Sequence, residues 1–132
     1  MARRPQREKT HEYLFLVYYD EKKMQQLSQD EWDALNRECI ACVAGLQASG
    51  HCLEGAPLLS TETATTVRVR DGGPLITDGP FAETKEQLRA FICWRRATAT
   101  KPSGWRRRFP PARYGSVEIR PVRELMEEGN RK

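Results

Sequence analysis

Residues 13–19, YLFLVYY, and residues 29–49, QDEWDALNRECIACVAGLQAS, decide the fold class of this chain. The first is a continuous aromatic and aliphatic run of strand length, typical of a strand covered on at least one face. In the second, apolar residues recur at steps of three and four, as on one face of a helix. Ser28 and Glu31 have capping-box spacing before it, and Gly50 follows as a stop signal. The sequence therefore predicts a strand followed by a long amphipathic helix.

Strand patterns account for most of the remaining chain. Residues 64–70, ATTVRVR, alternate with the period of a strand and lead into the turn signal Asp71-Gly72-Gly73. Such a turn predicts a hairpin, with residues 74–77 as the return strand. Asp78-Gly79-Pro80 then ends that strand. The other strand patterns cover residues 51–59, 85–94 and 116–122.

The order of these elements predicts an α+β fold of the ferredoxin-like type, a split βαβ sandwich. That fold needs a second helix between Trp94 and Tyr114. The sequence there has Pro102 and Gly104 in the middle and no apolar stripe, which disfavours a helix. We expect a disordered or extraneous extension, a folded domain and a disordered tail. Their predicted bounds are residues 1–11, 12–126 and 127–132.

The composition is that of a small globular protein. A chain of 132 residues fits one domain. No apolar run approaches the roughly 20 residues that a membrane span needs, so we expect a soluble protein. The basic N-terminus has no secretory pattern, and the four cysteines then indicate reduced thiols in the cytoplasm.

The segment Thr77–Leu88, TDGPFAETKEQL, resembles the YCII-related family of bacterial proteins, in the branch named for its DGPF motif. The matching residues of that motif region are Asp78, Gly79, Pro80, Phe81, Glu83 and Lys85. A second match is PPARYGSVEIRPVREL, and the resemblance spans residues 13–125. It implies a homodimer of the dimeric α+β barrel type. It supplies no agreed reaction.

Residues 92–108 depart from the family pattern, although both flanks follow it. Family members continue from KEQL through a strand such as FYLLEA into an acidic and then Ala-rich helix. Reading the back-translated segment from the third base of each codon permits Leu-Leu-Glu-Ala and then an Arg-Asp-Arg-Asp-Glu-Ala helix. We therefore hypothesise a local frameshift in the gene, in which one base is lost near the codon of Phe91 and one base is gained near the codon of Phe109.

The net charge of +4 raises the question of nucleic-acid binding. Lys and Arg concentrate at residues 3–9 and 95–108, and the second cluster coincides with the shifted frame. A basic stripe along one element would be stronger evidence. We therefore predict no nucleic-acid partner.

Asp78 and His51 are the candidate catalytic residues. Asp78 stands where a strand turns sharply, so its carboxylate is either a general base or anchor for a ligand, or a cap on the turn. His51 follows Gly50 at the start of a strand and is either its acid-base partner or a structural histidine. Relatives outside the DGPF branch are thought to place a His and an Asp in one cleft. Glu83 and Lys85 are more typical of a solvated polar face.

Cys39 and Cys42 form a C-x-x-C pattern inside the predicted helix. Without a second ligand pair, buried small hydrophobic side chains explain them better than zinc or redox chemistry. No nucleotide-binding or nucleophile motif is found, and we predict neither a cofactor nor a metal.

Two functions remain open. The first is a small-molecule-binding protein or enzyme that uses Asp78, with or without His51, in a cleft. The alternative is a non-catalytic regulatory partner of an extracytoplasmic-function sigma factor, because genes of the DGPF branch commonly lie beside such factors.

Overall fold

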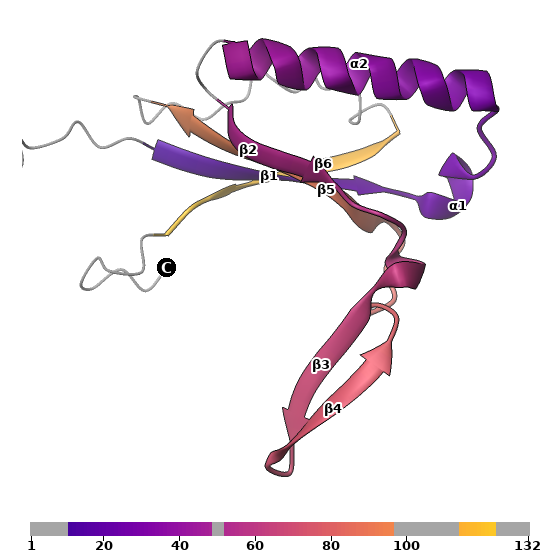
Figure 1. Cartoon of the computed structure of the whole chain (residues 1–132), viewed down its shortest axis with the longest axis vertical. Helices are drawn as coiled ribbons and strands as arrows, with labels where there is room; N and C mark the ends of the chain where they lie inside the picture. The colour runs from indigo at the N-terminus through magenta and orange to yellow at the C-terminus, as the bar shows by residue number, and fades with distance from the viewer. Residues whose placement is uncertain (1–10, 49–51, 97–113, 124–132) are drawn as a thin grey trace, which may run out of the picture.

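The computed structural model describes residues 11–48, 52–96 and 114–123 (Figure 1). The chain forms a mixed α+β fold, as predicted from its sequence. The helices are α1, Glu21–Met24, and α2, Gln29–Ala48, with a short 3-10 helix η1, Thr61–Thr63. The strands are β1 His11–Tyr19, β2 Cys52–Pro57, β3 Thr65–Arg70, β4 Gly73–Asp78, β5 Gln87–Arg96 and β6 Gly115–Pro121.

Four of the strands form one antiparallel sheet with the order β2-β5-β1-β6. The aromatic run of β1 lies in its centre, between β5 and β6. Phe15 is opposite Ile92 on one side and Ile119 on the other. Because side chains alternate along a strand, these three residues point to the same face of the sheet.

Helix α2 lies along that face (Figure 1). It begins with the predicted capping box, since the Ser28 hydroxyl accepts from the Glu31 N–H and the Glu31 carboxylate accepts from the Ser28 N–H, both at 3.1 Å. These contacts hold the pKa of Glu31 below its usual range. The core between helix and sheet contains the buried side chains Tyr13, Phe15, Val17, Tyr19, Met24, Leu35, Leu46, Ile92 and Trp94.

The opposite face of the sheet carries the other half of the alternating side chains. Leu14 and Leu16 of β1 pair with Cys93 and Phe91 of β5 on this face. All four are half-buried. We call this surface the open face, because no helix of the described residues lies along it (Figure 1).

Strands β3 and β4 form a separate two-stranded hairpin, which confirms the hairpin predicted from the turn signal. Asp71 and Gly72 make the turn with positive φ angles of 53° and 79°. We call residues 65–78 the arm. It extends away from the sheet on the side of the open face (Figure 1).

Several expectations concern residues outside the described ones. The second helix expected between Trp94 and Tyr114 falls largely on residues 97–113, and the candidate His51 and the predicted tail lie outside as well. His11 belongs to β1, where it pairs with Arg96, so the strand begins one residue before the predicted domain start. No helix in the described parts of the chain is long and apolar enough to cross a membrane.

Candidate functional site

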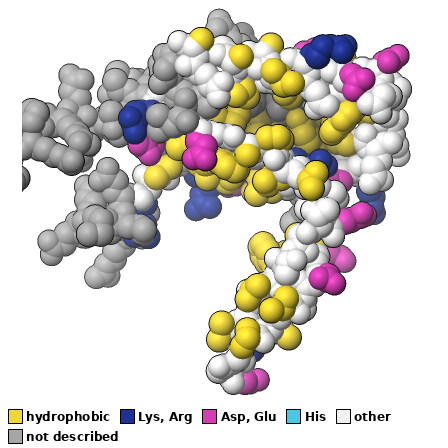
Figure 2. Space-filling model, viewed as in Figure 1, with side chains coloured by type: hydrophobic (Ala, Val, Ile, Leu, Met, Phe, Trp, Pro, Cys, Tyr) yellow, Lys and Arg dark blue, Asp and Glu magenta, His cyan; other side chains and the backbone are white. Residues whose placement is uncertain are grey.

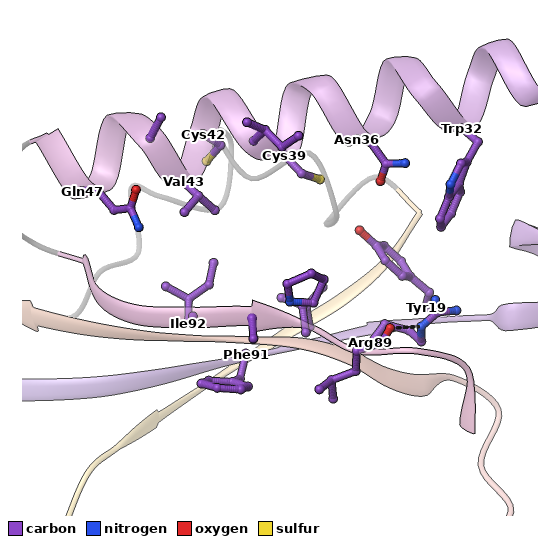
Figure 3. A pocket seen from close by; sticks show the side chains of 18 residues that line it. Tyr19, Trp32, Asn36, Cys39, Cys42, Val43, Gln47, Arg89, Phe91 and Ile92 are labelled. Carbon is purple, nitrogen blue, oxygen red and sulfur yellow. Dashed lines mark hydrogen bonds between the residues drawn. The ribbon is translucent and has the colours of Figure 1, made fainter. Parts of the chain in front are cut away.

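A cavity of about 560 Å³ lies between α2 and the sheet. It is lined by 18 residues, most of them apolar, and opens to the surface as a hollow with hydrophobic walls (Figures 2 and 3). The helix supplies Trp32, Cys39 and Val43, while the sheet supplies Val17 and Ile92. In Figure 3, Ile92 rises from the sheet toward Val43, whereas Phe91 points to the opposite side.

The sheet wall of the cavity depends on a glycine. Gly55 of β2 is opposite Ile92 of β5, and a Cβ atom at Gly55 would lie 2.9 Å from the Phe91 carbonyl oxygen and 3.3 Å from the Ile92 side chain. The missing side chain therefore lets β2 approach β5 closely at the cavity wall.

Tyr19 brings a polar group into this apolar space. Its ring rises from the end of β1 toward α2 (Figure 3). Burial raises the pKa of the Tyr19 phenol, and the neighbouring Cys39 thiol, which shares a hydrogen bond with it, raises it further. Burial and Cys39 also raise the pKa of the Cys42 thiol. Tyr19 and Cys42 are therefore neutral at physiological pH.

Arg89 is the one cation among the described lining residues, and its charge is compensated. Its Nη1 lies 3.4 Å from Glu21 Oε1, and its Nε donates to the Leu58 carbonyl oxygen at 3.1 Å. The side chains of Arg89 and Glu21 are only 17% and 12% exposed, so the pair is largely shielded from solvent. An anionic ligand would therefore have to compete with Glu21 for this guanidinium.

The Glu21 carboxylate accepts several hydrogen bonds in addition to its ion pair with Arg89. Its carboxylate accepts from the Thr61 N–H at 3.0 Å, the Thr61 hydroxyl at 2.9 Å and the Ser60 hydroxyl at 3.3 Å. Burial alone would raise the pKa of Glu21, but these hydrogen bonds and the Arg89 charge outweigh it and lower the pKa. The network ties the start of α1 to η1 and β5 beside the cavity.

The lining has the chemistry of a binding site for a neutral molecule. None of the described residues that line it is Asp, Glu or His, so they provide no carboxylate or imidazole for acid-base catalysis. Nor do the described residues contain a group of three or more His, Cys, Asp or Glu side chains that could hold a metal ion.

The DGPF segment lies elsewhere, at the base of the arm. Asp78 ends β4 opposite Thr65, and its exposed carboxylate forms no hydrogen bond with any described residue. The turn is held by backbone groups instead. The Gly79 N–H donates to the Ala64 carbonyl at 2.7 Å, and the Gly79 carbonyl accepts from the Thr66 hydroxyl at 2.8 Å.

A sequence profile of the YCII-related domain matches residues 11–126. The chain belongs to the YCII-related family. An uncharacterized protein of Rhizobium meliloti is 33% identical over 112 residues, which cover 83% of this chain and 90% of that relative.

The rest of the motif in this YCII-related chain is also exposed. Phe81 is 77% exposed, and its carbonyl oxygen accepts from Arg68 Nη2 at 3.1 Å. Pro80, Glu83 and Lys85 lie on the surface. None of the six motif residues lines the cavity, so the motif and the cavity are separate features of the described structure.

Cys39 and Cys42 lie on the inner side of α2, where both line the cavity and pack against the core. Sequence reasoning assigned them to the apolar face but missed Glu21 and Arg89. The available signal for Tyr19 was the alternation of β1, which places Tyr19 on the core face and Tyr18 on the other. A contact between residues 68 positions apart, such as Glu21 with Arg89, leaves no periodic signal in one sequence.

Proposed function

We propose that this YCII-related protein binds a neutral, mostly apolar small molecule in the cavity between α2 and the sheet. The observation that carries this proposal is the volume of about 560 Å³ together with its lining. Ligand sites for small molecules commonly measure about 300–1,000 Å³, with apolar walls and a few polar groups that fix orientation.

The polar lining groups indicate how the ligand would be oriented. Asn36 on α2 and Tyr19 on β1 point into the space from opposite walls (Figure 3). An amide offers both donors and an acceptor, and a neutral phenol offers a donor and an acceptor. A ring or branched chain that carries one hydroxyl, carbonyl or amine group fits both requirements. A carboxylate or phosphate does not, because Arg89 is already paired with Glu21.

An enzymatic role of Asp78 with His51 is a separate proposal. Asp78 has an exposed carboxylate outside the cavity, so this chemistry would need a second site at the end of β4. The availability of that carboxylate supports such a role. Loss of turnover in Asp78→Asn with unchanged ligand affinity would test it once a substrate is known.

The fold supports a self-associating protein. The strand order β2-β5-β1-β6 fits the ferredoxin-like arrangement, in which helices cover one face of the sheet. The open face, with Leu14, Leu16 and Phe91, would then be covered by a second copy. We propose that the protein is a homodimer of the dimeric α+β barrel type.

The alternative function, regulation of an extracytoplasmic-function sigma factor, has one observation in its favour. The arm and the adjoining Phe81 expose apolar side chains that suit a protein contact. Titration with the purified sigma factor tests it. If a variant with a filled cavity still binds the sigma factor, the surface that binds the factor lies outside the cavity.

Fluorescence of the neutral probe N-phenyl-1-naphthylamine tests the cavity proposal. With about 17 non-hydrogen atoms, the probe should bind the wild type with a Kd on the order of 100 µM. Ala44→Trp fills the cavity mouth from α2 and should abolish binding. Ala41→Trp is the matched control, because Ala41 is exposed on the same helix and outside the lining. Equal binding by both variants would refute the proposal.

A further inference from the structure

The arm exposes an unusual amount of apolar surface for so small an element. Val67, Val69 and Ile76 are 63%, 68% and 65% exposed. A two-stranded hairpin without further packing is marginally stable in water at best. Within residues 11–48, 52–96 and 114–123, no layer covers these side chains, so the apolar surface of the arm is available for a contact with a partner.

The apolar residues of the arm gather on one of its faces. Val67 pairs with Ile76 and Val69 pairs with Pro74, and alternation places these four on the same face. The other face carries Arg68 and the Thr66–Thr77 pair, together with Leu75. In Figure 2, hydrophobic side chains of the arm gather toward the space beneath the sheet.

That space is bounded by a second apolar wall. The open face of the sheet looks toward the same side from which the arm descends (Figure 1). Its half-buried residues Leu14, Leu16 and Phe91 therefore lie on the same side of the sheet as the arm. A molecule that covers the open face would lie on the same side of the sheet as the arm (Figure 1).

We propose that the apolar face of the arm docks on a second copy of this chain, so that each arm clasps the sheet of its partner. The proposal rests on the sheet-to-sheet homodimer proposed above. A two-fold axis makes the same surface patch contact itself, and a single association then covers both walls on both copies. A second copy is favoured over another partner because it has the same open sheet face of apolar side chains. One association would bury the open face and the apolar face of the arm together.

The clasp also gives the DGPF segment a role. Gly79 has a positive φ of 95°, which favours glycine, and its backbone binds Ala64 and Thr66 at the base of the arm. Arg68 of β3 donates to the carbonyl oxygen of Phe81, which follows β4. These contacts hold together the two chain segments at the base of the arm. In this proposal the motif closes the base of the clasp.

Sedimentation equilibrium on three full-length proteins tests the clasp. Ile76→Glu places a carboxylate on the apolar face and should weaken dimerisation by about 100-fold. Thr77→Glu adds the same charge at the next residue, on the opposite face, and should change dimerisation by less than about threefold. Equal dimerisation by the two variants would overturn the clasp and leave the sheet-to-sheet dimer intact.

A mixed dimer of ¹³C-labelled and unlabelled chains provides a direct measurement without substitution. Isotope-filtered spectra should contain intermolecular NOEs from the methyl groups of Val67, Val69 and Ile76. A wild type that stays monomeric at about 200 µM would overturn the clasp and the dimer together. Probe binding in the cavity, measured on the same samples, reports on the proposed ligand site independently of either result.

Discussion

Val17 and Val67 are the same residue in strands of similar pattern, yet Val17 is 1% exposed and Val67 is 63% exposed. Val17 lies in β1 with strands on both sides and α2 above it, whereas Val67 lies in a hairpin that stands away from the body. Alternation and turn chemistry are sufficient to predict a strand. Burial depends on a second layer, which the body supplies for itself and the arm lacks within the described chain.

The largest contrast should come from truncating one buried and one exposed side chain. Phe15→Ala in β1 leaves a cavity in the core, where Phe15 is 1% exposed, and should cost about 3–5 kcal/mol. Val69→Ala in the arm should cost less than about 0.5 kcal/mol in the monomer. Urea denaturation of dilute samples measures both. A comparable cost at Val69 would mean that the arm is packed in the monomer.

The frameshift hypothesis concerns the body and leaves the arm sequence unchanged. Restoring the shifted frame over residues 92–108 removes Pro102 and Gly104 from the segment where the family has a helix. Those two residues cost about 3 and 1 kcal/mol in a helix interior, so the restored protein should be more stable by about 4 kcal/mol. Thermal unfolding measures the gain.

The gene sequence decides whether that experiment describes the native protein. The nucleotides through codons 90–110 should encode Leu-Leu-Glu-Ala in the third-base frame. A stop codon there, or a different pattern, would end the hypothesis, and the basic segment would again be a candidate surface for an acidic partner.

Glu21→Gln should destabilise the body at neutral pH by about 1–3 kcal/mol, because the carboxylate accepts several hydrogen bonds and faces Arg89. The pKa of Glu21 is lowered from 4.5, so its contribution is present above that pH and is lost as the pH falls through the folded-state pKa. Unfolding free energies of both proteins should therefore converge below about pH 4.5. A difference that is constant with pH would contradict the assigned network.

At the base of the arm, substitution of Gly79 should lower the stability, whereas substitution of Asp78 should leave it almost unchanged. Gly79→Ala forces a side chain into a positive φ of 95° and should cost about 1 kcal/mol or more. Asp78→Ala should change stability by less than about 0.5 kcal/mol, since the described residues offer its carboxylate no hydrogen bond. Hydrogen exchange of the arm amides measures both effects. A larger loss at Asp78 would restore it as a cap on the turn.

Periodic signals predicted the elements of this fold well. The aromatic run gave β1, the three- and four-residue spacing with the Ser28 capping box gave α2, and Asp71-Gly72 gave the hairpin turn. These signals are local, so one sequence contains them completely. The separation of the hairpin from the sheet was not predicted, because strand propensity does not specify which strands pair.

The cavity could not be predicted for a related reason. Its walls come from α2, β1, β2 and β5, and β2 approaches β5 closely at Gly55. The sequence instead drew attention to Asp78, whose motif is contiguous and therefore recognisable. The compensation of Arg89 by Glu21, which determines what the cavity can bind, became visible only in three dimensions.

Methyl chemical shifts during a titration with indole test the central claim most directly. Indole is neutral, apolar and has one N–H donor, so it matches the proposed ligand class. The account predicts that the methyl resonances of Val17, Val43 and Ile92 shift together and saturate with one Kd, while those of Val67, Val69 and Ile76 stay in place. Shifts confined to the arm, or none in the cavity at saturating indole, would contradict it.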